Sequence, residues 1–219
     1  MSAEGSGWQA ESRKVFADVR DPARRSAAVV TFHRRLDEVL AESVQAHGAA
    51  IACRRGCHYC CYLNVEVQPA EAFTLAAWIK RRFAAPQLAE LIARLRENVA
   101  RACAFGAEAI RRTNLRCALL SEDGTCSAYD ARPAQCRKFH STRLATCEAS
   151  YANPADDSIE SPEHPAVAHN AAVIVALARR AVRDAGFDES TGDLQASLLE
   201  ALENPKAERR WRDGKKAFV

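Results

Sequence analysis

All nine cysteines of the chain lie between Cys53 and Cys147, and this clustering constrains the fold more than any other feature of the sequence. Four of them fall within nine residues, Cys53-Arg-Arg-Gly-Cys57-His-Tyr-Cys60-Cys61, and three more follow at Cys117, Cys126 and Cys136. Cysteines at such short spacings can converge on one ion or cluster, because the backbone amides of tight turns also point at the sulfur atoms. The sequence therefore predicts a metal centre.

The composition and the N-terminus predict a cytoplasmic protein. Hydrophobic residues make up 48% of the chain and charged residues 27%, the balance of a soluble globular protein. The segment Met1 to Gly7 has neither a basic start nor an apolar run, and the apolar run 171–178 is far shorter than the roughly 20 residues that span a bilayer. No membrane partner is expected. A reducing cytosol and an odd number of cysteines favour metal ligands or redox thiols over disulfides.

The net charge of +3 is too small to predict nucleic-acid binding. Many of the cations nevertheless lie close in sequence to cysteines: Arg54, Arg55, Arg111, Arg112, Arg116, Arg132, Arg137, Lys138 and Arg143. They could lower the pKa of neighbouring thiols and offset the charge of a thiolate-rich site, or form a solvated basic face. Both interpretations are open from the sequence.

Hydrophobic periodicity predicts a mainly α fold, a helical scaffold around a cysteine-rich, loop-rich metal-binding lobe, with almost no sheet. Apolar residues at three- and four-residue steps predict about five helices, over residues 22–47, 69–83, 86–112, 166–185 and 193–202. At 219 residues the chain is expected to form a single domain, 1–219. Its parts are helices over 22–112 with a first cysteine knot at 53–61, the lobe over 113–150, and C-terminal helices over 166–219.

Three further expectations concern packing. The helix over 166–185 is apolar around most of its circumference and should be the most buried. Cys103 lies four residues after Val99 on a helical stripe, which favours a small buried side chain over a ligand. The tail from Lys206 is basic and contains Trp211 and Phe218, whose rings are expected to dock on the body of the protein rather than on a partner.

The cysteine spacing indicates more than one simple tetrahedral site. Cys57-x2-Cys60 forms a knuckle, but the side chains of adjacent Cys60 and Cys61 tend to diverge, which suits a polynuclear centre or two sites. Four thiolates satisfy one zinc ion or one [4Fe–4S] cluster. The predicted ligands exceed that number, which leaves room for two mononuclear sites or for one cluster with spare thiols. They are Cys53, Cys57, Cys60, Cys61, Cys117, Cys126, Cys136 and the weaker candidate Cys147. His58 and His140 are expected at the surface or behind the ligands.

Two separated motifs carry a family resemblance over roughly residues 53–147. They are Gly56-Cys57-His-Tyr-Cys60-Cys61 with Glu71-Ala72, and Cys117-Ala-Leu-Leu with Asp123-Gly124-Thr-Cys126-Ser-Ala-Tyr129, Arg132-Pro133 and Cys136-Arg137. The sequence resembles the bacterial YkgJ-like CxxCxxCC cysteine-cluster family, described as a zinc- or iron-chelating domain. The first interval here is Cys53-x3-Cys57 rather than x2, so the role of Cys53 is less fixed. The resemblance implies binding of zinc, iron or an iron–sulfur cluster, and the wider group includes an iron–sulfur-associated flagellin lysine N-methylase.

Three functions follow from these observations. The leading one is a cytosolic protein that holds iron, including as an iron–sulfur cluster such as [4Fe–4S], or Zn²⁺ through its cysteines. The second is an iron–sulfur-dependent enzyme of the methylation or redox type, although no glycine-rich nucleotide motif follows a predicted strand. The third is a structural module in which zinc staples a helical scaffold that binds an unidentified protein partner or a nucleic acid. Whether the protein is an enzyme is open from the sequence.

Overall fold

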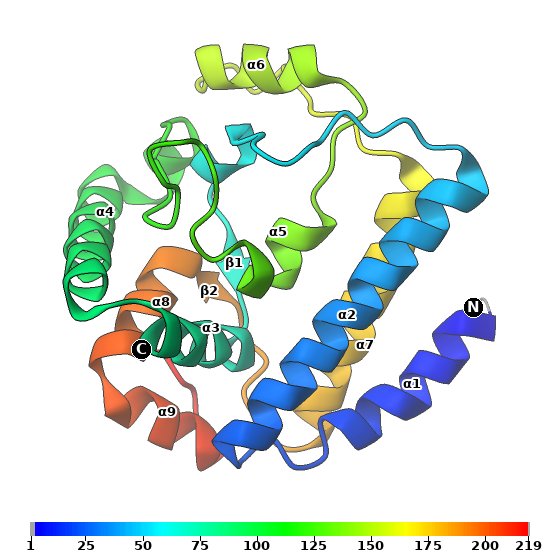
Figure 1. Cartoon of the computed structure of the whole chain (residues 1–219), viewed down its shortest axis with the longest axis vertical. Helices are drawn as coiled ribbons and strands as arrows, with labels where there is room; N and C mark the ends of the chain where they lie inside the picture. The colour runs from blue at the N-terminus through cyan, green and yellow to red at the C-terminus, as the bar shows by residue number, and fades with distance from the viewer. Residues whose placement is uncertain (1–2, 219) are drawn as a thin grey trace.

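The computed structural model describes residues 3–218, which form a mainly helical fold, as predicted (Figure 1). The helices are α1 Ala3–Val15, α2 Pro22–His47, α3 Pro69–Arg82, α4 Ala85–Arg111, α5 Ala134–Lys138, α6 Leu144–Ala152, α7 Pro165–Asp184, α8 Leu194–Glu203 and α9 Pro205–Arg212, with 3₁₀ turns η1 Tyr59–Tyr62 and η2 Tyr129–Ala131. One small sheet pairs β1 Glu66–Val67 antiparallel with β2 Gly192–Asp193, in the register Glu66 to Asp193. The expectation of almost no sheet is confirmed for these residues.

Helix α2 begins and ends where its sequence indicates. The side chain of Asp21 accepts hydrogen bonds from the backbone N–H groups of Ala23 and Arg24, and Pro22 occupies the first turn. Gly48 ends the helix in the left-handed conformation, with φ of 57°. The other predicted helices are also present, as α3, α4, α7 and α8.

Helices α5, α6 and α9 were not predicted, and for residues 1 to about 20, where α1 forms, the sequence leaves a loose arm or a short helix open. Helix α1 has glycines and no clear stripe, yet it packs on α7, where Trp8 is buried and its Nε1 donates to the Ile174 carbonyl at 3.3 Å. Helices α5 and α6 lie in the segment that the sequence indicated as loop, and each carries a cysteine, Cys136 and Cys147. Short helices of this kind depend on tertiary contacts rather than on their own periodicity.

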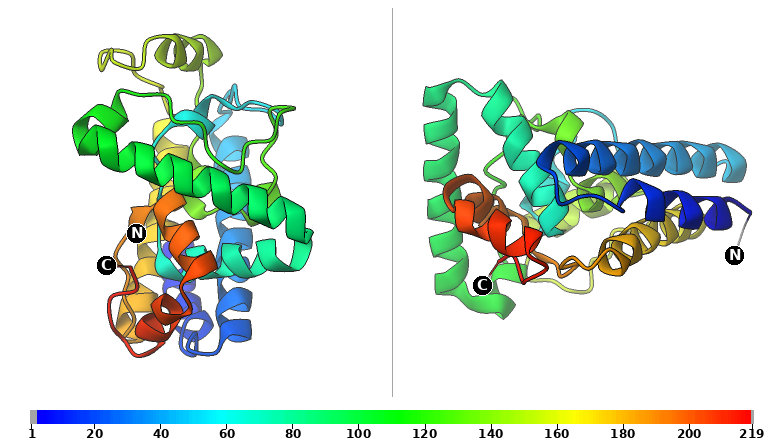
Figure 2. Two further views of the ribbon diagram at one scale, coloured as in Figure 1. Left: turned by 90° about the vertical axis from the view of Figure 1, so that its left-hand side faces the viewer. Right: turned by 90° about the horizontal axis from the view of Figure 1, so that it is seen from below.

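The helices lie on two sides of the molecule with α3 between them (Figure 2). One core forms mainly among α1, α2 and α7, and a second among α3, α4 and α8 beside the cysteine segments. Helix α3 contributes Phe73 to the first core and Leu75 and Ile79 to the second. The expectation that α7 is the most buried helix is therefore wrong, because α3 buries nine of its fourteen residues and α7 six of its twenty.

The expectation for Cys103 is also wrong, because this residue is exposed on α4. Leu91 and Leu95 are fully buried, but the stripe runs out past Val99, and Gly106 interrupts the helix with φ of 75°. The apolar periodicity in the sequence continues along α4 beyond the point where other parts of the protein pack against this helix. In the C-terminal tail, by contrast, Trp211 is buried and stacks on Phe187 with ring centroids 4.6 Å apart, which confirms docking on the body.

Among the residues that the structure describes, each helix is too short or too polar to cross a lipid bilayer.

Candidate metal centre

The first cysteine segment is a reverse turn that leads into η1. The backbone N–H of Cys57 donates to the Arg54 carbonyl at 3.0 Å, and Gly56 adopts a φ of 86° that only glycine takes up easily. Cys60 and Cys61 then lie in η1, where Cys61 N–H donates to the His58 carbonyl at 2.9 Å. The glycine therefore gives the turn that directs Cys57 and Cys60 toward the same side.

The second cysteine segment folds back on itself as a tight hairpin. Leu120 and Cys126 pair as an antiparallel bridge, and Ser127 N–H donates to the Leu119 carbonyl at 2.8 Å. Gly124 turns the chain with φ of 78°. The two cysteine segments also join directly, since Cys117 N–H donates to the Cys61 carbonyl at 2.8 Å.

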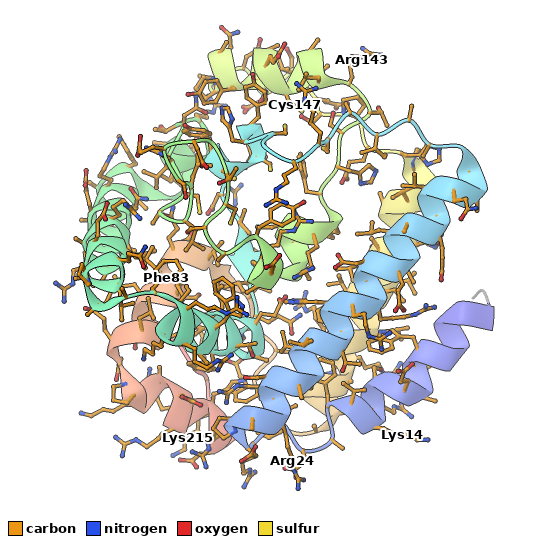
Figure 3. All side chains as sticks on the ribbon, in the orientation of Figure 1. Lys14, Arg24, Phe83, Arg143, Cys147 and Lys215 are labelled. Atoms are coloured by element: carbon orange, nitrogen blue, oxygen red, sulfur yellow. The ribbon has the colours of Figure 1, made fainter. Side chains whose placement is uncertain are left out.

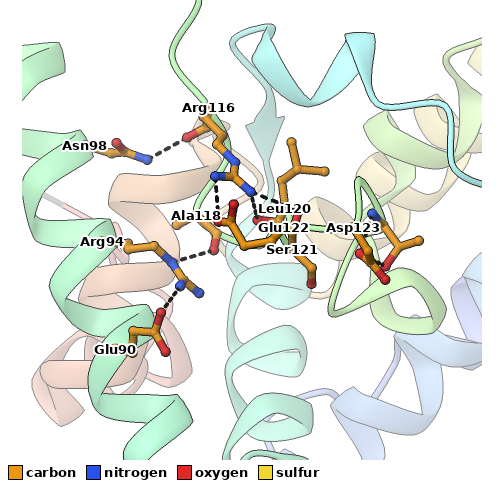
Figure 4. Close-up of polar contacts among 10 residues, drawn as sticks. Glu90, Arg94, Asn98, Arg116, Ala118, Leu120, Ser121, Glu122 and Asp123 are labelled. Atoms are coloured by element: carbon orange, nitrogen blue, oxygen red, sulfur yellow. Dashed lines mark hydrogen bonds and ion pairs between the residues drawn. The ribbon is translucent and has the colours of Figure 1, made fainter.

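Helix α4 fixes the backbone on both sides of Cys117 (Figure 4). Asn98 Nδ2 donates to the Arg116 carbonyl at 2.8 Å, and Arg94 Nε donates to the Ala118 carbonyl at 3.2 Å. The Ala118 N–H in turn donates to Gln195 Oε1, on α8, at 3.0 Å. The backbone on both sides of Cys117 is thus held by α4 and α8.

Six of the predicted ligands line one cavity of about 420 Å³: Cys57, Cys60, Cys61, Cys117, Cys126 and Cys136. They come from the first turn, the hairpin and α5, so the cavity lies where the two cysteine segments meet. Apolar residues also line it, including Leu119 and Leu194, together with the charged side chains of Arg132 and Asp193. Within residues 3–218, no three His, Cys, Asp or Glu side chains already converge on a single ion position.

Burial favours the protonated form of three of these thiols, those of Cys117, Cys126 and Cys136. It raises the pKa of Cys117 to about 12 and also raises the pKa of Cys126 and of Cys136. For Cys60, a hydrogen bond with Cys61 is the largest cause and burial the second, and together they raise its pKa. A metal that binds here must displace protons.

Arg132 is the cation that acts on these thiols. Its charge opposes the effect of burial by lowering the pKa of Cys60, Cys126 and Cys136. The guanidinium carbon lies 3.9 Å from the ring centroid of Tyr129, and among the described residues its buried Nε has no hydrogen-bond partner. Several neighbouring cations instead pair with carboxylates: Arg112 with Asp157, Arg116 with Glu122, and Arg137 with Asp37. Of the two interpretations that the sequence left open, an effect on the pKa of neighbouring thiols applies to Arg132.

Cys53 and Cys147 lie outside the lining of this cavity. Cys53 is exposed and its Sγ accepts from Ser141 N–H at 3.3 Å. Loss of hydration around the sulfur raises the pKa of Cys53, and the charges of Cys57, Cys60 and Cys147 raise it further, so these four thiols are neighbours. Cys147 lies on α6, at the edge of the molecule (Figure 3). There Cys147 and Cys60 line a second cavity of about 440 Å³.

Neither His58 nor His140 lines the cysteine cavity. His140 is buried and uses both ring nitrogens, since Nδ1 donates to the Lys138 carbonyl at 3.0 Å and Nε2 accepts from His164 N–H at 3.0 Å. His58 stacks on Tyr59 with ring centroids 5.0 Å apart. The sequence analysis missed Asp193, which lines the cavity and whose pKa is raised by burial. Its position before a helix indicates an N-cap, but no local signal places it near cysteines about 60 residues away.

Residues 52–157 match the family model described as "CxxCxxCC: Putative zinc- or iron-chelating domain". The matched region spans the first turn, the hairpin, α5 and α6, and so includes all eight cysteines predicted as ligands. No curated protein and no solved structure matches the chain.

Proposed function

Residues 52–157 belong to the zinc- or iron-chelating CxxCxxCC family, and on that premise we propose that this is a cytosolic protein holding an iron–sulfur cluster in its cysteine cavity. The observation that carries the proposal is the lining of that cavity by six cysteines. Four thiolates ligate a [4Fe–4S] cluster, so the lining supplies a full ligand set and two further thiols.

The chemistry of the donors and the size of the cavity support a cluster. Soft thiolates select zinc and iron–sulfur clusters over hard cations. A single tetrahedral zinc holds its sulfurs at about 2.3 Å, whereas the thiols here surround an open volume of about 420 Å³. When bound, a cluster would supply one-electron redox chemistry. The residues of the chain would orient the cysteines, and Arg132 would offset part of the negative charge of the thiolates.

Zinc is the second candidate, and the way the segments join favours it. The first turn supplies Cys57 and Cys60, the hairpin supplies Cys117 and Cys126, and the two segments are hydrogen-bonded at Cys61. Two pairs of cysteines from two turns are typical of a closed structural zinc site. In that case the ion would only cross-link the lobe.

Anaerobic purification followed by iron, sulfide and zinc analysis tests the proposal. We expect brown protein with several iron and sulfide atoms per chain, and loss of both in Cys117→Ser and Cys126→Ser. The exposed Cys103→Ser variant is the control and should retain them. Colourless protein with one zinc per chain, lost in the same two variants, would replace the iron–sulfur proposal with the zinc alternative. Retention of metal in both variants would reject the site itself.

A further inference from the structure

A buried polar junction lies directly behind the helix that carries Cys136. His33 of α2 and Glu71 of α3 have side chains only 8% and 7% exposed. His33 Nε2 donates to Glu71 Oε1 at 2.7 Å, and the backbone N–H of Ala134 donates to the same oxygen at 2.7 Å. We call these three groups the Glu71 junction. A buried carboxylate needs such donors, because burial without them is strongly unfavourable.

The junction holds the first residue of a very short helix. Ala134 begins α5, which has five residues, and Cys136 lies two residues further on. So few residues cannot maintain a helix by their own hydrogen bonds, so the position of α5 depends on the groups that hold it. At its other end Arg137 pairs with Asp37 of α2 at 2.6 Å and donates through Nε to the Arg132 carbonyl at 2.8 Å.

Helix α5 also lies between two cavities. Gln135 and Lys138 line the cysteine cavity of about 420 Å³ and, on the other side, a cavity of about 620 Å³. Glu71 and Ala134 line only the second of these. Ala134 packs in the first core and Cys136 against the second, and the polar contacts of Glu71 and Arg137 add to this packing where the cavities leave α5 open.

We propose that Glu71 is a positioning residue for Cys136, which holds α5 through the Ala134 N–H and so keeps the thiol at the wall of the metal cavity. His33 fixes the orientation of the carboxylate. The inference rests on the proposed function in one respect, that Cys136 is a metal ligand. Glu71 itself lies outside the lining of the cysteine cavity and contributes no donor to it.

Replacing Glu71 by two residues of similar size distinguishes its role as a hydrogen-bond acceptor from the effect of its charge. Glu71→Gln keeps a side-chain oxygen that can accept from both donors, and we expect its metal affinity to stay within about threefold of the wild type. Glu71→Leu leaves the Ala134 N–H without a partner, and we expect affinity to fall about tenfold or more. Co²⁺ serves as the probe, with affinity measured by chelator competition and the number of bound thiolates by the intensity of sulfur-to-cobalt absorption, which should decrease in Glu71→Leu.

A double-mutant cycle with Cys136→Ser distinguishes positioning from general destabilisation. If Glu71 acts through Cys136, Glu71→Leu should have no further effect on Co²⁺ affinity once Cys136 is replaced. Glu208→Leu is the matched control, because Glu208 forms a 2.6 Å ion pair with the buried Arg25 of α2 and neither residue lines the cavity. It should lower thermal stability and leave Co²⁺ affinity and absorption unchanged.

Each outcome decides the inference. The inference would be overturned if Glu71→Leu lowered Co²⁺ affinity equally in the wild type and in Cys136→Ser. Unchanged sulfur-to-cobalt absorption in Glu71→Leu would also overturn it. If Glu71→Leu does not fold, Glu71→Asp keeps the charge but shortens the reach, and wild-type Co²⁺ affinity in that variant would also overturn the inference. If Cys136→Ser alone retains full affinity, the proposed ligand set fails instead, which is a different result.

Discussion

Cys60 lines both the cysteine cavity and the second cavity beside α6, so its thiol adjoins two groups of cysteines. On one side lie Cys117, Cys126 and Cys136, and on the other Cys53 and Cys147. A thiol at such a position affects the pKa of the thiols around it when it gains or loses charge. We therefore expect Cys60 to couple the two groups.

Replacement of single cysteines by serine should rank them by position. The six that line the cavity should each lose most of the bound metal: Cys57, Cys60, Cys61, Cys117, Cys126 and Cys136. Cys53 and Cys147 lie outside the lining, and we expect intermediate losses from their replacement. Elemental analysis of anaerobically purified variants is the measurement. Full metal content in Cys126→Ser together with loss in exposed Cys103→Ser would contradict the ranking.

Metal affinity and stability of the metal-free protein should depend on pH in opposite directions. Each thiol with a raised pKa releases a proton when it binds the metal as a thiolate. At a pH below that pKa, each such thiol should therefore raise the metal affinity by up to about tenfold for every pH unit. In the metal-free protein, burial raises the pKa of Cys117 to about 12. Its stability should therefore be fully present below the unfolded-state thiol pKa of about 8.5 and decrease as pH rises from there toward 12.

Calorimetry in buffers of different ionisation enthalpy counts the protons released on metal binding, and urea unfolding from pH 7 to 10 follows the metal-free protein. Proton release near zero, or a metal-free protein that becomes more stable across that range, would show that the thiols are not buried in the protonated form.

Much of this residue-scale picture was predictable, because the six cavity cysteines belong to two motifs whose turn residues are visible in the sequence. Their roles as ligands remain predictions. Cys103 was placed wrongly because a stripe on α4 does not reveal where the facing helix ends. The contact between Glu71 and Ala134 was not predictable, since it joins residues 63 positions apart.

At the scale of elements, the two glycine turns of the cysteine segments pack against each other. A Cβ added at Gly124 would lie 3.4 Å from His58 Nδ1 and 3.8 Å from the Gly56 carbonyl oxygen. The hairpin and the first turn therefore approach through a position without a side chain. This contact determines how closely the two cysteine segments approach each other.

Gly124→Ala tests that contact, with Gly48→Ala as its control. Both glycines have positive φ, 78° and 57°, but a Cβ at Gly48 meets nothing within 4 Å. Each substitution should lower the free energy of unfolding by about 1–2 kcal/mol through backbone strain. Only Gly124→Ala should also weaken metal binding, as measured by chelator competition. Equal metal affinity in the two variants would show that the turns need not approach.

The predictable elements are those with their own start and stop signals. Helix α2 has Asp21, Pro22 and Gly48 at its ends and a long apolar stripe, so its bounds follow from the sequence. Helices α5 and α6 have five and nine residues and no side-chain cap. They are stabilised by contacts such as Arg137 with Asp37 and the rings of Tyr62 and Tyr151, 4.8 Å apart, which periodicity does not encode.

For the whole molecule, removal of the metal should affect the cysteine lobe and spare the first core. Residues 113–147 contain short elements around an open cavity, whereas α2 and α7 pack along a continuous apolar interface. Hydrogen exchange after anaerobic chelation should therefore become faster over 113–147 and change little in α2 and α7. Unchanged exchange in the lobe would reject coupling between metal binding and its folding.

The pairing of β1 with β2 also places the completion of the cavity late in synthesis. Leu194 N–H donates to the Val65 carbonyl at 2.7 Å, and Asp193, Leu194 and Gln195 line the cavity. These residues are added about 60 positions after Cys136, roughly 3–12 s later at ordinary rates of translation. Until residues 193–195 have been made, the cysteines lack the C-terminal wall of their cavity, which leaves their thiols accessible to metal donors and oxidants alike.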